Sequence, residues 1–244
     1  MPRLHTHSQH FLRSPRLVAE LIGHSNLRKN DTVVDLGAGS GVITSTLARR
    51  VKHVVAVENE PQALAKLMTN IDNLDNVEVI NDDILNFMPP QVPYKIFSNI
   101  PFSISSPIIR RFTSIDDPPK SIYLIAQKQF AKKLIMSKGH FTSQLGAQIS
   151  PWWLARIRKP LRKTDFTPPP AVDTVLLELK QVPEPLLSPK LANEYRQFIE
   201  KCFSSQTYFG KLAKDAVGIS PERKPSELTA SQWVELFKST KNIQ

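Results

Sequence analysis

The sequence has one cysteine, Cys202, among 244 residues. One thiol cannot close an internal disulfide or build a cysteine-based zinc site, so we expect a reducing compartment, the cytoplasm. Phe198 and Cys202 share one face of an amphipathic segment, which favours a buried structural thiol. His5, His7 and His10 are close in sequence but have no partner cluster of ligands, so no metal is expected.

The sequence also lacks a long hydrophobic run. No stretch approaches the roughly 20 apolar residues that span a bilayer, and the first 17 residues lack the apolar block of a secretory signal. No acidic residue precedes Glu20, which indicates a basic N-terminal arm, with an organellar transit peptide as the alternative. The whole chain carries 32 Lys and Arg against 22 Asp and Glu, a net charge of +10. With no membrane segment, the expected polyanionic partner is nucleic acid.

Apolar runs alternate with helix-like segments from residue 32 to about residue 136. The predicted strands are 32–37, 53–58, 77–81, 95–100 and 121–127, and the predicted helices are 42–51, 61–74, 105–113 and 128–136. This alternation predicts an α/β fold with a parallel, doubly wound sheet.

The rhythm changes after Gly139. Runs at 152–161 and 174–181, joined by a proline-rich loop, predict an antiparallel pair at the sheet edge. Amphipathic segments at 188–204, 207–217 and 229–238 predict a small C-terminal helical domain. We therefore expect one domain over residues 1–182 and another over 183–244.

Glycine is scarce, yet three of the eight glycines fall within the motif DLGAGSG, at Gly37, Gly39 and Gly41. Placed between a predicted strand and a predicted helix, they allow a sharp turn and close approach of the backbone to a ligand. The spacing differs from the dinucleotide form G-x-G-x-x-G, and there is no Walker lysine. A pyrophosphate ligand is therefore not expected.

Acidic residues follow the next two predicted strands. Glu58 stands 21 residues after Gly37, where a carboxylate can accept both hydroxyls of a ribose. Asp82 and Asp83 end the third strand, where an acid can meet the exocyclic amine of adenine. A nucleoside site without a phosphate clamp fits S-adenosylmethionine. In the alternative interpretation, both aspartates only cap a helix.

The fourth predicted strand leads into Asn99, Ile100, Pro101 and Phe102 at the same sheet edge. The Asn99 side-chain oxygen and the Ile100 carbonyl could draw an adenine amine toward tetrahedral geometry and localise its lone pair. Pro101 would fix the turn, and Phe102 would offer a stacking face. The alternative is a strand-ending turn with a core phenylalanine.

Six motifs in one order carry a resemblance to a known family. They are SQHFL at 8–12, DLGAGSG at 35–41, AVENE at 56–60, NDDIL at 81–85, KIFSNIPFSISSPIIRRF at 95–112 and FTPPPAVDTVLLEL at 166–179. Over residues 8 to about 180 the sequence resembles the ribosomal RNA adenine N6-methyltransferases, most of all the erythromycin-resistance branch. The resemblance implies a Rossmann-like methyltransferase sheet with an antiparallel edge strand and a C-terminal helical domain.

The resemblance also implies roles for individual residues. His10 and Leu12 would flank S-adenosylmethionine, while Gly37, Gly39, Glu58 and Asp83 would hold its tail, ribose and adenine. Asn99 would touch both cofactor and target amine. Phe102 and Phe166 would sandwich an adenine flipped out of its helix. Asn is usual in the family where this chain has His10, and Tyr is common where it has Phe102.

Basic residues near the predicted site are candidates for RNA binding, with a solvated helix face as the alternative for each lysine. They are Arg110, Arg111, Lys132, Lys133, Arg156, Arg158, Arg162 and Lys163.

The resulting hypothesis is a cytoplasmic, monomeric enzyme that methylates N6 of one adenine in protein-free or early-assembly 23S ribosomal RNA and confers macrolide-lincosamide-streptogramin B resistance. One alternative is a small-subunit 16S rRNA adenine dimethyltransferase. Another is a non-catalytic RNA-binding or transcription-assisting protein on the same fold. The sequence does not distinguish mono- from dimethylation.

Overall fold

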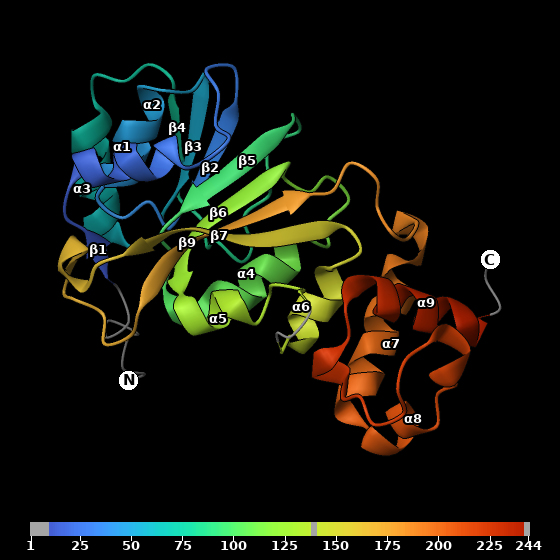
Figure 1. Ribbon diagram of the computed structural model, residues 1–244. Helices are drawn as coiled ribbons and strands as arrows, with labels where there is room; N and C mark the ends of the chain where they lie inside the picture. The colour runs from blue at the N-terminus through green and yellow to red at the C-terminus, as the bar shows by residue number, and fades with distance from the viewer. Residues whose placement is uncertain (1–9, 138–140, 242–244) are drawn as a thin grey trace, which may run out of the picture. The chain divides into compact units, whose positions relative to one another are not determined.

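The computed structural model describes residues 10–137 and 141–241, and its main feature is a seven-stranded sheet (Figure 1). The strand order is β4-β3-β2-β5-β6-β9-β7. The strands are β2 (Thr32–Leu36), β3 (His53–Val57), β4 (Val77–Ile80), β5 (Tyr94–Ser98), β6 (Ser121–Gln127), β7 (Trp153–Leu161) and β9 (Thr174–Gln181). All seven were predicted, with bounds that agree within two residues.

The first five of these strands are parallel, as predicted. β2 pairs with β3 and β5, β3 with β4, and β5 with β6. All five therefore end at the same edge of the sheet, which gathers the loops that follow them. In Figure 1 the arrows of β7 and β9 point in opposite directions, as expected for an antiparallel edge pair.

Helices cover both faces of the sheet (Figure 1). α1 (Pro15–Gly23), α2 (Val42–Ala48) and α3 (Pro61–Ile71) lie on one face, and α4 (Ser105–Phe112) lies on the other. α1 was not predicted, because basic residues around it indicated an extended arm. Its Val18, Leu21 and Ile22 are buried against the sheet, and this burial explains the helix.

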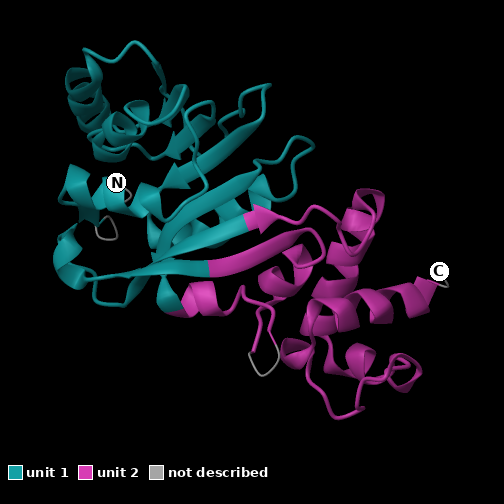
Figure 2. Ribbon diagram, turned by 45° about the horizontal axis from the view of Figure 1, so that its top comes forward, with its two compact units in different colours: residues 1–128, 157–179 teal, residues 129–156, 180–244 magenta. Residues whose placement is uncertain are grey.

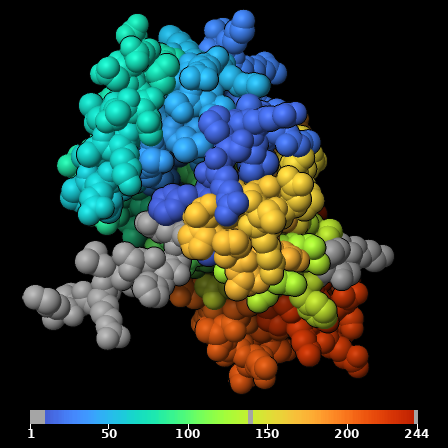
Figure 3. All heavy atoms as spheres, turned by 90° about the vertical axis from the view of Figure 1, so that its left-hand side faces the viewer, coloured from blue at the N-terminus to red at the C-terminus, as the bar shows by residue number. Residues whose placement is uncertain are grey.

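A second, two-stranded sheet ties distant segments together. β1 (Phe11–Leu12) pairs antiparallel with β8 (Phe166–Thr167), so that Leu12 lies opposite Phe166. Arg13 N donates to Asp165 O at 3.1 Å, and Arg13 Nε donates to Thr167 Oγ1 at 2.6 Å. Figure 3 shows the β1 segment in blue beside the β8 segment in yellow. We call residues 10–13 with 165–168 the strap.

The chain divides into two compact units (Figure 2): Met1–Lys128 with Ile157–Leu179, and Gln129–Arg156 with Lys180–Gln244. The sequence predicts a single boundary between residues 182 and 183, whereas the two compact units exchange segments earlier in the chain. The reason is α6 (Gln144–Ile149), which packs on α7 (Ala192–Ser204) within the second unit. Tyr195 Oη donates to Ala147 O at 3.2 Å, so the segment before β7 groups with the C-terminal helices.

Aromatic packing holds the second unit together. It contains α5 (Lys128–Lys132) from Gln129 onward, α6, α7, α8 (Gln206–Gly210) and α9 (Ala230–Lys241). Trp233 of α9 is fully buried and meets Phe198 edge-on and Phe203 in a stack, at 6.1 and 5.9 Å between centroids. Cys202 is buried beside them, and burial raises its thiol pKa to about 12, as expected for a structural cysteine.

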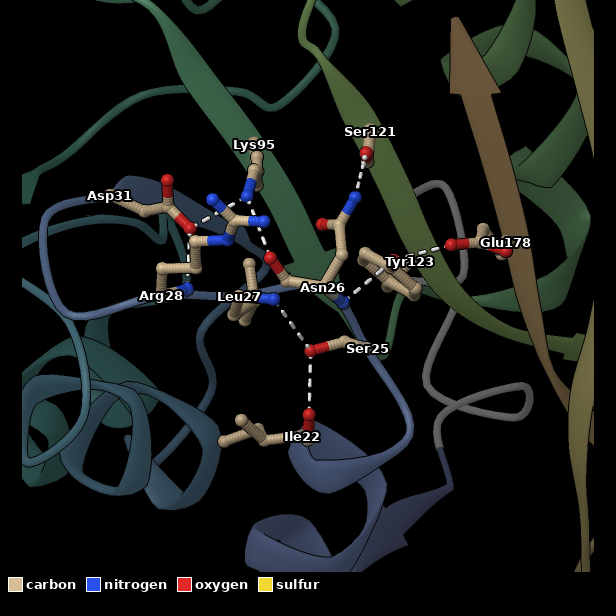
Figure 4. A network of polar contacts seen from close by, with 10 residues as sticks. All are labelled: Ile22, Ser25, Asn26, Leu27, Arg28, Asp31, Lys95, Ser121, Tyr123 and Glu178. Atoms are coloured by element: carbon tan, nitrogen blue, oxygen red, sulfur yellow. Dashed lines mark hydrogen bonds and ion pairs between the residues drawn. The ribbon is translucent and has the colours of Figure 1, made fainter.

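A polar network fixes the loop between α1 and β2 at the opposite, amino-terminal edge of the sheet (Figure 4). Tyr123 Oη accepts from Asn26 N at 2.9 Å and donates to Glu178 Oε1 at 2.5 Å. Lys95 Nζ donates to Asn26 O and Asp31 Oδ2 at 2.8 and 2.7 Å. These contacts join the loop to β5, β6 and β9, so the network serves the fold, although Asn26 Oδ1 has no partner among the described residues.

Candidate active site

A pocket of about 300 Å³ lies at the carboxyl ends of the parallel strands, within the first unit. The residues that follow β2, β3, β4 and β5 converge on it, since parallel strands end at one edge. Its lining contains eight of the predicted site residues: His10, Leu12, Gly37, Gly39, Glu58, Asp83, Asn99 and Ile100. The same residues reach the pocket from five separate stretches of chain.

The glycine loop forms one wall. Gly37, Gly39 and Gly41 all have positive φ, at 66°, 58° and 86°. At Gly41 the positive φ strains any residue other than glycine, and an added Cβ would lie 2.7 Å from Leu67 Cδ1, so the Leu67 side chain would also have to move. The loop brings main-chain atoms close to the pocket, as predicted.

Glu58 is buried at 8% exposure and is held by backbone donors. Its Oε2 accepts from Gly39 N at 2.8 Å, and its Oε1 accepts from Asn59 N and Glu60 N at 2.9 and 2.8 Å. An ionised carboxylate offers about four acceptor positions. Three are used by backbone donors, so one acceptor position of the carboxylate remains open.

Asp83 begins a tight turn that forms one wall of the pocket. Its Oδ1 accepts from Leu85 N at 2.7 Å, and its carbonyl accepts from Asn86 N and Phe87 N, each at 2.8 Å. Asp82 Oδ1 accepts from Asp83 N at 2.7 Å. Both aspartates thus cap the turn, and Asp83 also lines the pocket.

The Asn99 amide has a defined orientation. Its Nδ2 donates to the His10 carbonyl at 2.7 Å. Because that carbonyl only accepts, the nitrogen must face it, and Oδ1 is left as the acceptor on the other side of the amide. His10 Nδ1 in turn lies 2.8 Å from Pro168 O in the strap. The strap therefore positions the side chain that was predicted to bind the target amine.

The two predicted stacking aromatics lie elsewhere. Phe102 is half-buried outside the pocket lining, with its ring centroid 5.5 Å from that of His10. Phe166 is fully buried in the core with Leu12, Leu161 and Leu176. A ring at 0% exposure has no face for a base, so the structure does not bring Phe166 to the site, and its conformation here is that of a core residue.

Three residues near the site were not predicted. Phe11 lines the pocket at 48% exposure, and its ring lies 3.5 Å from a Cβ built at Gly39. Ser98 is fully buried, and its Oγ accepts from Leu36 N at 2.8 Å, which joins β2 and β5 where their ladder ends. The third is Asp35. The places of Asp35 and Ser98 within continuously buried strands would have indicated their burial, but not their hydrogen bonds.

Asp35 is a fully buried acid directly before the glycine loop. Its Oδ2 accepts from Thr44 Oγ1 at 2.7 Å, while Oδ1 has no partner among the described residues. Burial raises its pKa to about 7; the Thr44 hydrogen bond opposes this rise, and the charge of Glu58 adds to it.

The predicted RNA-binding residues fall in both units. Arg110, Arg158, Arg162 and Lys163 are exposed in the first unit, and Lys132, Lys133 and Arg156 are exposed in the second. Some are engaged within the chain: Arg158 Nε donates to His24 O at 2.9 Å, and Lys163 Nζ donates to Ala171 O at 2.7 Å. Arg162 Nη2 lies 3.2 Å from Asp165 Oδ1. Arg111 differs, because its half-buried guanidinium faces the Asp83 turn.

Within residues 10–137 and 141–241, no group of three or more His, Cys, Asp or Glu side chains could hold a metal ion. His5 and His7 lie outside these ranges. Across the same part of the chain, no helix has the length and apolar character needed to cross a membrane.

Comparison with known proteins identifies the family. The family model described as ribosomal RNA adenine dimethylase matches residues 4–209. The chain belongs to this family. A Limosilactobacillus reuteri protein named rRNA adenine N-6-methyltransferase is 30% identical over 239 residues, covering 96% of this chain and 95% of the relative. A Staphylococcus aureus protein of the same name is 30% identical over 238 residues, with 96% of each covered.

Other family members differ in name and length. A Dehalococcoides mccartyi protein named ribosomal RNA small subunit methyltransferase A is 26% identical and is covered to 85% of its length. Among solved structures, the 23S rRNA methyltransferase ErmE matches with TM-score 0.80 and 25% identity, covering 93% of this chain and 98% of ErmE. A Plasmodium falciparum dimethyladenosine transferase gives TM-score 0.78 at 20% identity, covering 96% and 99%, and shares the fold. The predicted fold class is confirmed.

Proposed function

We propose that this member of the ribosomal RNA adenine dimethylase family transfers a methyl group from S-adenosylmethionine to N6 of one adenine in 23S ribosomal RNA. The proposal depends most on one observation, the Asn99 amide fixed by the His10 carbonyl beside the glycine loop. An amide held in this way can accept a hydrogen bond from an adenine amine without further reorganisation.

The pocket residues fit the cofactor. Glu58 keeps one acceptor position for a ribose hydroxyl, and the Asp83 turn offers a wall for adenine. The positive φ values of Gly37 and Gly39 bring backbone close to the remaining tail. When bound, S-adenosylmethionine supplies an electrophilic methyl carbon on a sulfonium.

The chain's own residues prepare the nucleophile. Asn99 Oδ1 and the Ile100 carbonyl accept the two N6 hydrogens, which localises the nitrogen lone pair toward the methyl carbon. The bound cofactor would supply the methyl group, with the electron pair of its C–S bond left on sulfur. The methylated nitrogen then releases a proton to solvent, so no strong base is required.

The large-subunit target is favoured over the small-subunit one by two comparisons. The Limosilactobacillus reuteri and Staphylococcus aureus relatives named rRNA adenine N-6-methyltransferase are 30% identical to this chain and are covered to 95–96% of their length, whereas the small-subunit relatives are 25–26% identical and are covered to 85% of theirs. Two Bacillus relatives named rRNA adenine N-6-methyltransferase are also 26% identical and covered to 85%. ErmE, at TM-score 0.80, is described as a 23S rRNA methyltransferase. Methylation of this adenine would confer resistance to macrolide-type antibiotics by crowding their binding pocket. The active species is a cytoplasmic monomer.

The test uses purified full-length protein, labelled S-adenosylmethionine and two protein-free transcripts, 23S and 16S. We expect label in the 23S transcript, with Asn99→Ala at least 100-fold slower. Label only in 16S would support the dimethyltransferase alternative. Cofactor and RNA binding without transfer to either transcript would support the non-catalytic alternative.

A further inference from the structure

The turn that walls the adenine side of the pocket is held at both ends. At its start, the Asp83 carboxylate accepts from Leu85 N at 2.7 Å. At its other end, the carbonyls of Ile84 and Phe87 both accept from the guanidinium of Arg111, Ile84 O at 3.3 Å from Nη1. The last carbonyls of a helical turn lack partners within the turn, so Arg111 satisfies them.

The position of Arg111 is itself well defined. Its guanidinium carbon lies 4.9 Å from the Phe112 ring centroid, and Phe112 is fully buried in α4. The guanidinium is planar, and two of its nitrogens donate to two different carbonyls. This arrangement fixes both the distance and the angle between the guanidinium and the turn. Arg111 is therefore committed to the chain's own backbone and is not placed to bind an RNA phosphate.

Arg111 also connects two parts of the site. It lies on α4, which follows directly from the Asn99–Phe102 segment through a short 3-10 turn at Phe102–Ile104. The turn it holds presents Ile84 and Leu85 to the pocket. Arg111 thus connects two segments of the site. One is Asn99–Phe102, expected to bind the target amine, and the other is the turn after Asp83, expected to contact the cofactor's adenine.

We propose that Arg111 is a positioning residue that sets the adenine wall of the cofactor pocket and so determines recognition of the cofactor's base. This inference rests on the proposed function. It replaces the expectation that Arg111 binds RNA. Its effect should be confined to ligands that carry adenine.

The experiment compares two ligands on the full chain without RNA: S-adenosylhomocysteine by calorimetry, and S-ribosylhomocysteine, which lacks adenine, by competition. For Arg111→Met we expect the Kd of S-adenosylhomocysteine to rise about 10-fold, equivalent to about 1.4 kcal/mol, with that of S-ribosylhomocysteine changed less than about 2-fold. Arg111→Lys keeps the positive charge but loses the planar guanidinium that reaches both carbonyls. The Kd of this variant for S-adenosylhomocysteine should lie between those of wild type and Arg111→Met. Arg50→Met, at an exposed arginine after α2, is the matched control.

Three outcomes would overturn the inference. Equal weakening of both ligands would indicate a general structural role. Weaker RNA binding with unchanged Kd for S-adenosylhomocysteine would make Arg111 an RNA contact. A Kd for Arg111→Lys equal to that of wild type would show that the two-carbonyl fork is unnecessary. Failure of the wild type to bind S-adenosylhomocysteine would instead contradict the proposed function itself, and the inference with it.

Discussion

The two halves of the candidate site are held in different ways. In the half that we propose binds the cofactor, called the cofactor half, hydrogen bonds from backbone groups fix Glu58 and Asp83 around an open pocket. In the half that we propose binds the target adenine, called the base half, the two aromatic side chains pack on the protein itself: Phe102 on His10, and Phe166 in the core. The cofactor half therefore has an open pocket with its polar groups in place, whereas the aromatic rings of the base half pack against other side chains.

This difference bears on the order of binding. A cofactor can enter a pocket whose polar groups already have their positions, at little cost in conformational entropy. A flipped adenine needs a stacking face, and here Phe102 offers one only beside the His10 ring. We therefore expect cofactor binding to be independent of RNA, and base binding to depend on the strap that carries His10.

The largest expected effect concerns Phe166. If it is a core residue, Phe166→Ala should lower the free energy of unfolding by about 3–5 kcal/mol, measured by urea denaturation. Phe11→Ala, at a ring that is 48% exposed, is the control and should cost far less. A Phe166→Ala protein of unchanged stability that no longer methylates RNA would mean that the ring acts at the base, and the comparison of halves would fail.

Asn99 should produce the next largest effect. Asn99→Ala removes a preorganised acceptor, so kcat should fall about 10²–10³-fold in a single-turnover assay with RNA. Asn76→Ala is the matched control, because Asn76 Nδ2 also donates to backbone carbonyls, Ala48 O at 2.8 Å and Val51 O at 3.1 Å, away from the pocket. Equal loss of rate in both variants would indicate that only folding was disturbed.

Phe102 should have a smaller effect, confined to the RNA. Loss of base stacking costs about 1–3 kcal/mol, so Phe102→Ala should lower kcat/KM for RNA about 5- to 100-fold and leave the Kd of S-adenosylhomocysteine unchanged. Phe102→Tyr keeps the ring face and should keep the activity. If cofactor affinity fell instead, Phe102 would belong to the cofactor half.

The smallest expected effect is a pH dependence from Asp35. Below about pH 4 its carboxyl is protonated in folded and unfolded chains alike. Burial raises the pKa of Asp35 in the folded chain to about 7. Between about pH 4 and pH 7 the unfolded chain therefore loses this proton while the folded chain keeps it, so the free energy of unfolding falls as pH rises. Asp35→Asn has no such proton to lose, so this decrease in stability should be absent from the variant.

Thermal unfolding at pH 5 and pH 8 checks this sign. The Tm of Asp35→Asn minus that of wild type should increase between the two pH values by at least about 2–4 °C, the shift that 1 kcal/mol produces in a chain of this size. Asp75→Asn, at an exposed aspartate, should show no such increase. A difference that shrinks toward pH 8 would contradict the account of Asp35.

Local pattern was sufficient for the cofactor half. Continuous apolar runs mark buried parallel strands, and the glycine cluster and the acids come directly after them. β6 (Ser121–Gln127) begins and ends as predicted, and Glu58 and Asp83 line the pocket. Each of these features depends on residues close together in sequence, apart from the rule that parallel strands end at one edge.

The base half depends on long-range pairing, which local pattern does not contain. Phe166 is buried because β8 pairs with β1, more than 150 residues earlier in the chain. The role of Arg111 depends on which way a helix face turns, and a basic residue on a short helix is equally typical of a solvated or an RNA-facing surface. α1 was not predicted because its buried face consists of only Val18, Leu21 and Ile22, and the basic residues before them indicated an arm.

Mass spectrometry of ribosomal RNA from cells with and without the gene distinguishes a 23S methyltransferase from its alternatives. Digestion of 23S and 16S RNA into mapped fragments would locate any N6-methyladenine and count its methyl groups. We predict one modified adenine in 23S RNA that appears only with the gene and is absent with Asn99→Ala. Gene-dependent modification in 16S RNA alone, or in neither RNA, would contradict the account.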